Sequence, residues 1–272
     1  MFNFLRKKKK YFVSREGLRS ASDNGGYIAF VEKTLTDQKL FSDFKKSTTY
    51  QEILEHTSEE QAREYLKVIA DQTPEFMKDL KRFSINDLIG GANVVEFTED
   101  CKLSPSTLRY VKVASDLVHL FGADLNGARV AEIGVGYGGQ RLILDQVYRF
   151  HCYEMFDLPP VLALVSKYLE AHLLESSYAT KTLNTHTGDQ DYDLVISNYA
   201  FSELPAVVQR KYMEKVLKKS TRGYLTMNSG VSGGLYSEGR MTLEEIQYFI
   251  PSSKVIEEKP YTYNGNYILV WK

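Results

Sequence analysis

Two patterns of hydrophobic positions divide the chain near residue 126. Before that point, apolar residues recur at the three- and four-residue spacing of amphipathic helices. After it, short runs rich in β-branched residues alternate with longer helical stretches, which is typical of βαβ units around a mainly parallel sheet. The pattern therefore predicts an α-helical N-terminal region followed by an α/β domain.

The N-terminal half contains two helix starts. Ser58-Glu-Glu-Gln61 matches a capping box in front of apolar residues at helical spacing. Ser104-Pro105 supplies an N-cap and a first-turn proline for a second helix, which is expected to end at Gly122. Ile89-Gly-Gly-Ala92 predicts a loop or hinge. Residues 21–125 are interpreted as a helical region that helps to form an acceptor site, a cap or a dimer interface.

Seven strands and four helices are predicted after residue 126. A short Tyr-Asn-Gly turn separates the last two strands, so we expect them to be antiparallel, because a parallel return needs a crossover of about a dozen residues. The spacing favours an open, doubly wound, Rossmann-like sheet with an antiparallel last strand over an eight-unit barrel. The predicted strands are 129–133, 150–156, 180–186, 194–197, 223–227, 254–257 and 267–271. The predicted helices are 140–148, 160–173, 205–218 and 243–249.

Composition narrows the class of protein only slightly. Hydrophobic residues make up 43% and charged residues 25% of the chain, ordinary values that exclude global disorder. The net charge of −1 gives no overall attraction to nucleic acid. Cys101 and Cys152 lack metal-ligand spacing, which suits a reducing cytoplasm and predicts no metal site. No apolar run reaches the ~20 residues of a transmembrane helix.

Residues 1–20 differ sharply from the rest in charge. They hold seven Lys and Arg residues against one acid, which leaves a net charge of −7 for residues 21–272. Lys7 to Lys10 follow a short apolar start, so the segment could contact an anionic membrane surface or a charged lipid-linked substrate. It could equally be a solvated tail. No long apolar stretch follows, so it is not a signal peptide.

The most informative segment is Arg129-Val-Ala-Glu-Ile-Gly-Val-Gly-Tyr-Gly-Gly-Gln140. An apolar strand runs into a glycine-rich turn, and a helix follows at once. Glycine allows positive φ and lets a ligand approach the backbone, while the helix start directs free N–H groups toward the same place. Ligands of open α/β sheets bind at this end of the strands. The expected cofactor contacts in the turn are Gly134, Gly136, Tyr137 and Gly138.

Carboxylates near this turn help to distinguish cofactors. Glu132 lies two residues before the first glycine, where it would repel a pyrophosphate but suit the cationic end of a methionine-type ligand. The Gly-x-Gly-x-Gly spacing also differs from that of dinucleotide sites. Asp157, at the expected end of the next strand, can accept hydrogen bonds from both hydroxyls of a ribose, with mid-strand Glu154 as its competitor. Asp189 could accept an adenine amine or simply shape a turn.

Together these segments resemble the class I S-adenosylmethionine-dependent methyltransferases, and more narrowly a family of sugar O-methyltransferases. The segments that carry the narrower resemblance are 104–110, 132–140, 156–159 with 168–169, and 197–204. The resemblance covers roughly residues 100–272. It implies an S-adenosylmethionine-binding domain over residues 126–272 that methylates a hydroxyl of a surface glycan or a glycosylated small molecule. Segment 156–159 is also similar to the ribose-binding turn of plant O-methyltransferases, which implies that role for Asp157.

Methyl transfer to a sugar hydroxyl requires aligned reactants and a group that accepts the hydroxyl proton. Candidates follow the fourth predicted strand: Asn198 as a cofactor contact, Tyr199, and Glu203 as the general base. Glu203 could instead be an acidic residue that stabilises the start of the next helix. His186, at the expected end of the third strand, is the best-placed histidine.

Several residues could contact the acceptor. The polar loop from Asn228 to Tyr236 could close over it or be a plain surface loop. Arg109 could bind an anionic group of the acceptor or lie on an exposed helix face. Tyrosines that could stack on sugar faces are Tyr137, Tyr199, Tyr236 and Tyr263.

Other functions remain open at this level. The enzyme could methylate a phenolic or amine acceptor instead of a sugar. A nucleotide-dependent oxidoreductase conflicts with Glu132 and with the glycine spacing, and a non-catalytic binding protein would retain the fold without the reaction. No basic-aromatic stripe supports RNA binding. The expectation is a cytoplasmic enzyme that binds no nucleic acid; membrane contact through the basic N-terminus and homo-oligomer formation are left open.

Overall fold

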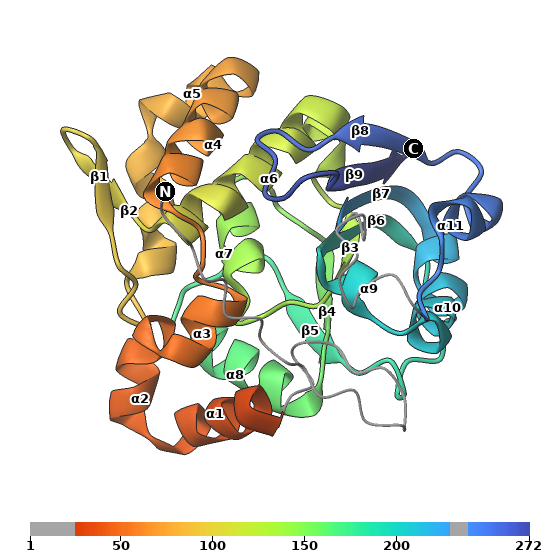
Figure 1. Cartoon of the computed structure of the whole chain (residues 1–272), viewed down its shortest axis with the longest axis horizontal. Coiled ribbons are helices and arrows are strands. Elements are labelled where there is room, and N and C mark those ends of the chain that lie inside the picture. Colours follow the sequence, from red (N-terminus) through yellow and green to blue (C-terminus); the bar gives the residue numbers. More distant parts are fainter. Residues whose placement is uncertain (1–24, 229–238) are drawn as a thin grey trace, which may run out of the picture.

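A computed structural model describes residues 25–228 and 239–272 of the chain. The N-terminal helices lie beside the C-terminal α/β sheet (Figure 1). The basic segment 1–20 and residues 229–236 of the predicted polar loop lie outside the described residues. No helix in the described ranges combines the length and apolar character needed to cross a bilayer.

The sheet has seven strands in the order β5-β4-β3-β6-β7-β9-β8. The first five in this order are parallel, and β9 is antiparallel to both of its neighbours. This confirms the predicted doubly wound, Rossmann-like sheet with an antiparallel last strand. The strands are β3 (Arg129–Ile133), β4 (Cys152–Phe156), β5 (Tyr178–Lys181), β6 (Tyr192–Asn198), β7 (Ser220–Met227), β8 (Lys254–Glu257) and β9 (Tyr267–Trp271).

The third strand was predicted in the wrong place. It ends at Lys181, and residues 182–186 form a turn instead of continuing the strand. The backbone oxygen of Thr182 accepts hydrogen bonds from the backbone N–H groups of Thr185 and His186. The Thr182 hydroxyl also accepts the Thr185 N–H at 3.2 Å. These short-range bonds compete with the strand and end it early.

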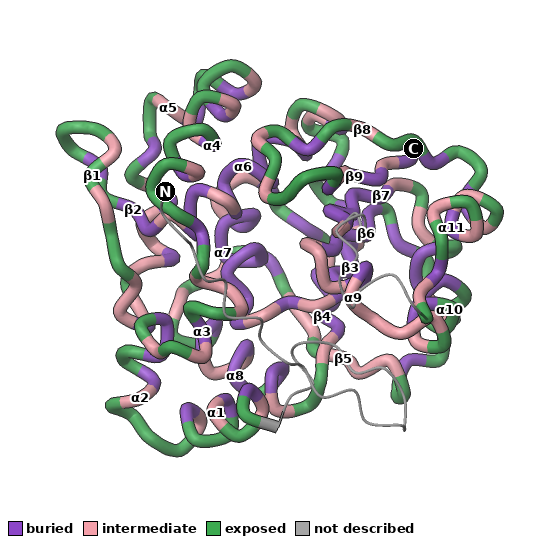
Figure 2. Tube along the Cα trace, in the orientation of Figure 1, coloured by how far each residue is buried: buried purple, intermediate pink, exposed green. Residues whose placement is uncertain are grey.

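Helices cover both faces of the sheet, and each face has its own apolar core. Val130 and Tyr153 face the core that contains α6, α7 and α8, while Ala131 and Phe156 face the one that contains α10 and α11. Figure 2 shows the buried positions concentrated in the central strands and in the helix surfaces against them. The helices are α6 (Pro105–Phe121), α7 (Gly139–Asp145), α8 (Pro159–Glu170), α9 (Ala200–Glu203), α10 (Ala206–Lys215) and α11 (Leu243–Phe249).

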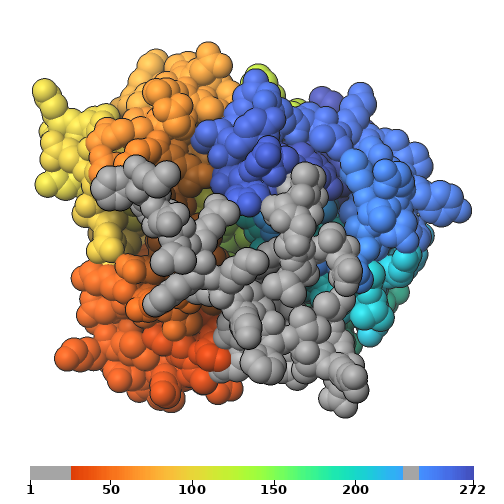
Figure 3. Space-filling view, in the orientation of Figure 1, coloured from red at the N-terminus to blue at the C-terminus, as the bar shows by residue number. Residues whose placement is uncertain are grey.

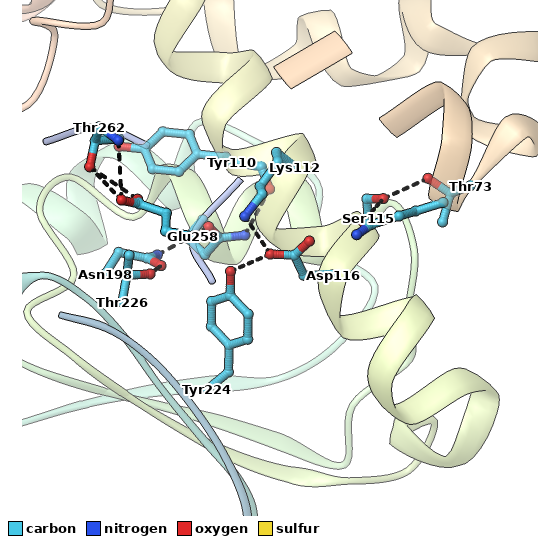
Figure 4. A network of polar contacts seen from close by, with 12 residues as sticks. Thr73, Tyr110, Lys112, Ser115, Asp116, Asn198, Tyr224, Thr226, Glu258 and Thr262 are labelled. Carbon is cyan, nitrogen blue, oxygen red and sulfur yellow. Dashed lines mark hydrogen bonds and ion pairs between the residues drawn. The ribbon is translucent and has the colours of Figure 1, made fainter. Parts of the chain in front are cut away.

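Helix α6 confirms the prediction made from its ends. The Ser104 hydroxyl caps it by accepting the Thr107 N–H at 3.1 Å, and Gly122 ends it with φ +62°. Two buried residues of α6 then tie it to the sheet. Lys112 pairs with Asp116 at 2.6 Å, and the Tyr224 hydroxyl of β7 donates to the same carboxylate (Figure 4).

The N-terminal half is helical as predicted, except for one hairpin. Residues 95–103 form an antiparallel pair of strands, because Val95 and Phe97 alternate with exposed residues while Glu99 and Asp100 make the turn. The helices of the N-terminal half pack against α8 and α6. The elements are α1 (Gly25–Thr36), α2 (Gln38–Asp43), η2 (Phe44–Lys46), α3 (Thr48–Ile53), α4 (Glu59–Gln72), α5 (Pro74–Lys78), η3 (Leu80–Asp87), β1 (Val95–Thr98) and β2 (Cys101–Leu103).

Candidate active site

A cavity of about 580 Å³ opens at the carboxyl ends of β3, β4 and β6. Ligands of open α/β sheets bind at this position. Its walls come from three parts of the chain: the strand ends, the N-terminal helices, and the loop between β8 and β9. The N-terminal helices and the C-terminal segment face each other across the middle of the molecule (Figure 3).

The glycine loop forms one edge of the cavity. Gly134 and Gly136 line it with φ values of +75° and +56°. A Cβ on Gly134 would lie 2.0 Å from the Cβ of Ala200, and one on Gly136 would lie 3.0 Å from Cδ1 of Leu54. Only glycine allows both the backbone conformation and this close approach. The loop is therefore held between the start of α9 and the chain that follows α3.

Tyr137, in the same loop, is turned away from the cavity. Its ring is fully buried, and its hydroxyl donates to Glu55 at 3.1 Å while accepting from Asn86 at 3.2 Å. The ammonium of Lys45 lies 4.5 Å from the ring centroid, and burial lowers the pKa of Lys45 to about 8. Tyr137 thus ties the glycine loop to the N-terminal helices. The other rings that contact it are Phe44, Tyr50, Tyr110 and Tyr168.

The two acidic candidates for ribose binding lie in different places. Asp157 lines the cavity, and its carboxylate accepts the backbone N–H groups of Val135 at 2.9 Å and Leu158 at 2.7 Å. Glu154 lies outside the cavity, where its carboxylate accepts from the Tyr192 hydroxyl at 2.6 Å and pairs with Lys181 at 2.9 Å. Of these two candidates, only Asp157 therefore faces a ligand-sized space.

Glu132 borders the cavity beneath the glycine loop. Its side chain is buried and accepts a hydrogen bond from the Tyr153 hydroxyl at 2.7 Å. Burial raises the pKa of Glu132 to about 8, because the ionised form loses its hydration. The carboxyl is thus mainly protonated near neutral pH in the free protein.

The end of β6 brings two polar residues to the opposite edge. The Asn198 amide donates to Gln140 at 3.2 Å, which fixes its orientation toward the cavity. Tyr199 has φ +66°, a strained conformation for a bulky side chain, and such strain is typical of functional sites. Its hydroxyl donates to Glu258, and burial raises its pKa, so the phenol stays protonated.

Glu203, the last residue of α9, also lines the cavity. Its Oε1 accepts a hydrogen bond from the Asn228 amide at 3.1 Å. Burial raises the pKa of its carboxyl, partly offset by the nearby Arg240 guanidinium. The hydrogen bond thus orients the side chain, and burial favours its protonated form.

Like Tyr137, three other predicted site residues do not line the cavity. Gly138 caps the start of α7, where a Cβ would lie 3.3 Å from the side chain of Leu169. The turn after β5 carries His186 beneath α10, where its ring lies 3.3 Å from the Lys215 carbonyl oxygen and burial lowers its pKa. Asp189 is exposed on the loop before β6.

Several lining residues escaped the sequence analysis. His56, Gln61 and Tyr65 reach the cavity from the N-terminal half, and Thr262 and Asn266 reach it from the β8–β9 loop. Gln61 and Tyr65 are four residues apart in the helix that Ser58 caps, so they share a helix face. No signal in the local sequence indicated that this helix face would lie against the sheet.

Of three further residues predicted to contact the acceptor, the structure places two in the cavity wall. Arg109 lines the cavity and donates to the Leu54 carbonyl oxygen at 2.8 Å, so it does not lie on a plain exposed helix face. Tyr263 lines the cavity with 52% of its side chain exposed, which leaves its ring open to a ligand. Tyr236 lies outside the described residues. Within residues 25–228 and 239–272, no group of three or more acidic, histidine or cysteine side chains could hold a metal ion.

No protein-family model and no curated protein matches the chain. Among solved structures, the methyltransferase domain of bacterial CtHen1-CN is 13% identical, with a TM-score of 0.44 over 60% of this chain and 97% of that one. The N-methyltransferase NodS from Bradyrhizobium japonicum WM9 is 10% identical, with a TM-score of 0.44 over 60% and 94%. The bifunctional kinase-methyltransferase WbdD is 10% identical, with a TM-score of 0.46 over 60% and 39%. Such distant likenesses carry no argument about activity, which has to come from the cavity.

Proposed function

We propose that this chain is an S-adenosylmethionine-dependent methyltransferase that acts on a sugar hydroxyl. The placement of two carboxyl groups, Asp157 and Glu132, on either side of a close-fitting glycine loop carries the proposal. S-adenosylmethionine has a ribose diol at one part and a cationic sulfonium and ammonium at another. Asp157 is placed for the diol, and Glu132 for the cationic end.

The residues present fit such a cofactor. Backbone N–H groups of Val135 and Leu158 hold the Asp157 carboxylate in a fixed orientation at the cavity, and carboxylate oxygens accept hydrogen bonds from ribose hydroxyls. Gly134 and Gly136 allow close approach of the ligand to the backbone. Glu132 beside the glycine loop suits a cation better than the pyrophosphate of a dinucleotide, because a nearby cation favours the ionised carboxylate, whereas an anion keeps the carboxyl protonated. The arrangement thus supports a sulfonium cofactor over NAD.

When bound, this cofactor supplies a methyl group on a positively charged sulfur. The residues of the chain have to align an acceptor hydroxyl, exclude water and take up its proton. We assign the proton to the Glu203 carboxylate, because Tyr199 stays protonated and His186 is outside the cavity. The polar and aromatic side chains of Gln61 and Tyr263 suit a carbohydrate, which agrees with the sequence resemblance.

Calorimetric titration of S-adenosylmethionine and NAD tests the cofactor. The wild type should bind S-adenosylmethionine alone, and Asp157→Ala should weaken that binding about 100-fold, since it removes two charge-assisted hydrogen bonds. Asp71→Ala, which removes an exposed carboxylate of α4, should bind like the wild type. Binding of NAD instead, or of neither ligand, would overturn the proposal.

Methyl transfer to a panel of nucleotide sugars and glycans, with phenols and amines alongside, tests the acceptor. We expect methylated carbohydrate. Methylation of phenols or amines alone would support the methyltransferase activity but would reject a sugar as the acceptor.

Binding of the cofactor should release a proton from Glu132. At pH 7 its carboxyl, with a pKa of about 8, is mainly protonated in the free protein, and a neighbouring cation favours the ionised form and lowers that pKa. Up to about one proton should therefore leave per cofactor bound. Calorimetry in two buffers of different ionisation enthalpy measures it, with Glu132→Gln as the control that releases none. A binding heat that is the same in both buffers would contradict the expectation.

A further inference from the structure

Arg109 is an unusual residue for this cavity. Among the described residues that line it, Arg109 is the only lysine or arginine, and three acids line the same space. One guanidinium N–H donates to the Leu54 carbonyl oxygen at 2.8 Å, and the group lies 5.5 Å from the ring centroid of Tyr110. No carboxylate of residues 25–228 or 239–272 lies within 4.0 Å of it. A guanidinium has five N–H donors, so donors remain for a ligand besides those to Leu54 and to the Tyr110 side chain.

Tyr65 provides a second donor beside it. Its side chain is 2% exposed, and its hydroxyl has no hydrogen-bond partner among the described residues. Buried hydroxyls in proteins are almost always paired, because an unpaired one costs free energy. Tyr65 and Arg109 both border the main cavity and the small space next to it, beside Tyr199.

Arg109 and Tyr65 lie at a different end of the cavity from the residues assigned to the cofactor. Asp157 follows β4, the glycine loop follows β3, and Tyr199 follows β6, so the three lie in this order along the sheet edge. Arg109 and Tyr65 lie at the Tyr199 end, with Glu258 close by. They are therefore on the far side of the glycine loop from the position assigned to the ribose, where an acceptor has to bind.

We infer that Arg109 and Tyr65 bind an oxyanion of the acceptor, so that the substrate is an acidic sugar carrying a carboxylate or a phosphate. The inference rests on the proposed function and specifies its substrate class. Arginine suits this task because its planar N–H pairs match the oxygens of either group. The three acids that line the main cavity lie in or just after β3, β4 and β6 and not in the N-terminal helical wall, and the carboxylate of Glu258 in the adjoining small space already accepts hydrogen bonds from Tyr199 and Thr262.

His56 lies at the rim of the cavity and can report on the site. Partial burial and the nearby Arg109 guanidinium lower the pKa of His56 to about 4. An anion bound to Arg109 cancels part of that positive charge, so it should raise the pKa of His56.

The experiment is a proton NMR titration of His56 in protein saturated with S-adenosylhomocysteine. D-glucuronate, glucose 1-phosphate and glucose are added separately, and His56→Gln assigns the resonance. We expect at least one of the two anions to bind and raise the pKa of His56, while glucose does neither. Preference for glucuronate indicates a carboxylate, and preference for glucose 1-phosphate indicates a phosphate.

Variants separate this site from the rest of the cavity. Arg109→Gln should bind the anion about tenfold to a hundredfold more weakly, and Tyr65→Phe a few-fold more weakly. Arg63→Gln removes the same charge from the exposed face of α4 and should change nothing. If Arg109→Gln does not fold, Tyr65→Phe decides, because the Tyr65 hydroxyl has no hydrogen-bond partner to lose within residues 25–228 and 239–272.

Two results would overturn the inference while leaving the proposed function intact. In the first, neither anion binds better than glucose. In the second, Arg109→Gln weakens the binding of S-adenosylhomocysteine itself, which would place the cofactor carboxylate on Arg109. Failure of the wild type to bind S-adenosylhomocysteine would instead reject the proposed function.

Discussion

Replacing Glu203 with glutamine should lower the turnover of methyl transfer by about 10²- to 10⁴-fold, the usual contribution of a general base. The carboxylate lies in the cavity just after β6, held by the Asn228 amide at 3.1 Å. Burial raises its pKa toward the pH range in which proton transfer is most efficient. Glutamine keeps the shape and the carbonyl oxygen that accepts from Asn228, but it cannot take up a proton.

Single-turnover rates and calorimetric affinity for S-adenosylhomocysteine distinguish this role from a structural one. The rate should fall while the affinity stays near that of the wild type. The acidic limb of the wild-type pH profile, which reports ionisation of the base, should vanish in Glu203→Gln. Glu214→Gln, in an exposed ion pair on α10, is the matched control. If turnover survives, Glu203 serves only as an acidic residue at the helix start.

The parts of the fold that local sequence controls could be predicted. The end-cap residues of α6 and the strand-turn-helix around Gly134 act within a few positions, so they can be recognised from sequence. The exceptions have local causes as well. Hydrogen bonds of Thr182 end β5 earlier than predicted. Alternating part-buried and exposed residues around Phe97 form a hairpin inside the helical N-terminal half.

The part of the cavity that directly follows the sheet strands was the most predictable from sequence. Gly134, Gly136 and Asp157 reach the cavity because they directly follow β3 and β4. His56, in the loop after α3, and Tyr65, in α4, are far from the strands in sequence, and only tertiary packing brings them to the cavity. The position of Tyr137 could not be predicted for the same reason. Its ring packs against aromatic rings of the N-terminal helices in the core and does not line the cavity.

Replacing Asp145 with alanine should lower the free energy of unfolding by about 3–5 kcal/mol, which is typical when one partner of a buried ion pair is removed. The side chains of Arg141 and Asp145 are 0% and 1% exposed and lie 2.9 Å apart. Asp145 also accepts the backbone N–H groups of Glu175 at 2.9 Å and Ser176 at 3.3 Å. Its loss leaves a buried guanidinium without a counter-charge against the ring of Tyr153.

Urea unfolding measures this change, and Asp43→Ala is the matched control. Asp43 pairs with Lys46 at 3.2 Å, but both side chains are 52% exposed, so that pair should contribute less than about 1 kcal/mol. Equal effects of the two substitutions would mean that the Arg141 charge is relieved by solvent. The consequence reaches the site, because α7 begins at Gly139 and the positive charge of Arg141 lowers the pKa of Glu132. Asp145 therefore helps to fix the helix that starts at the glycine loop, and its loss should weaken cofactor binding as well as the fold.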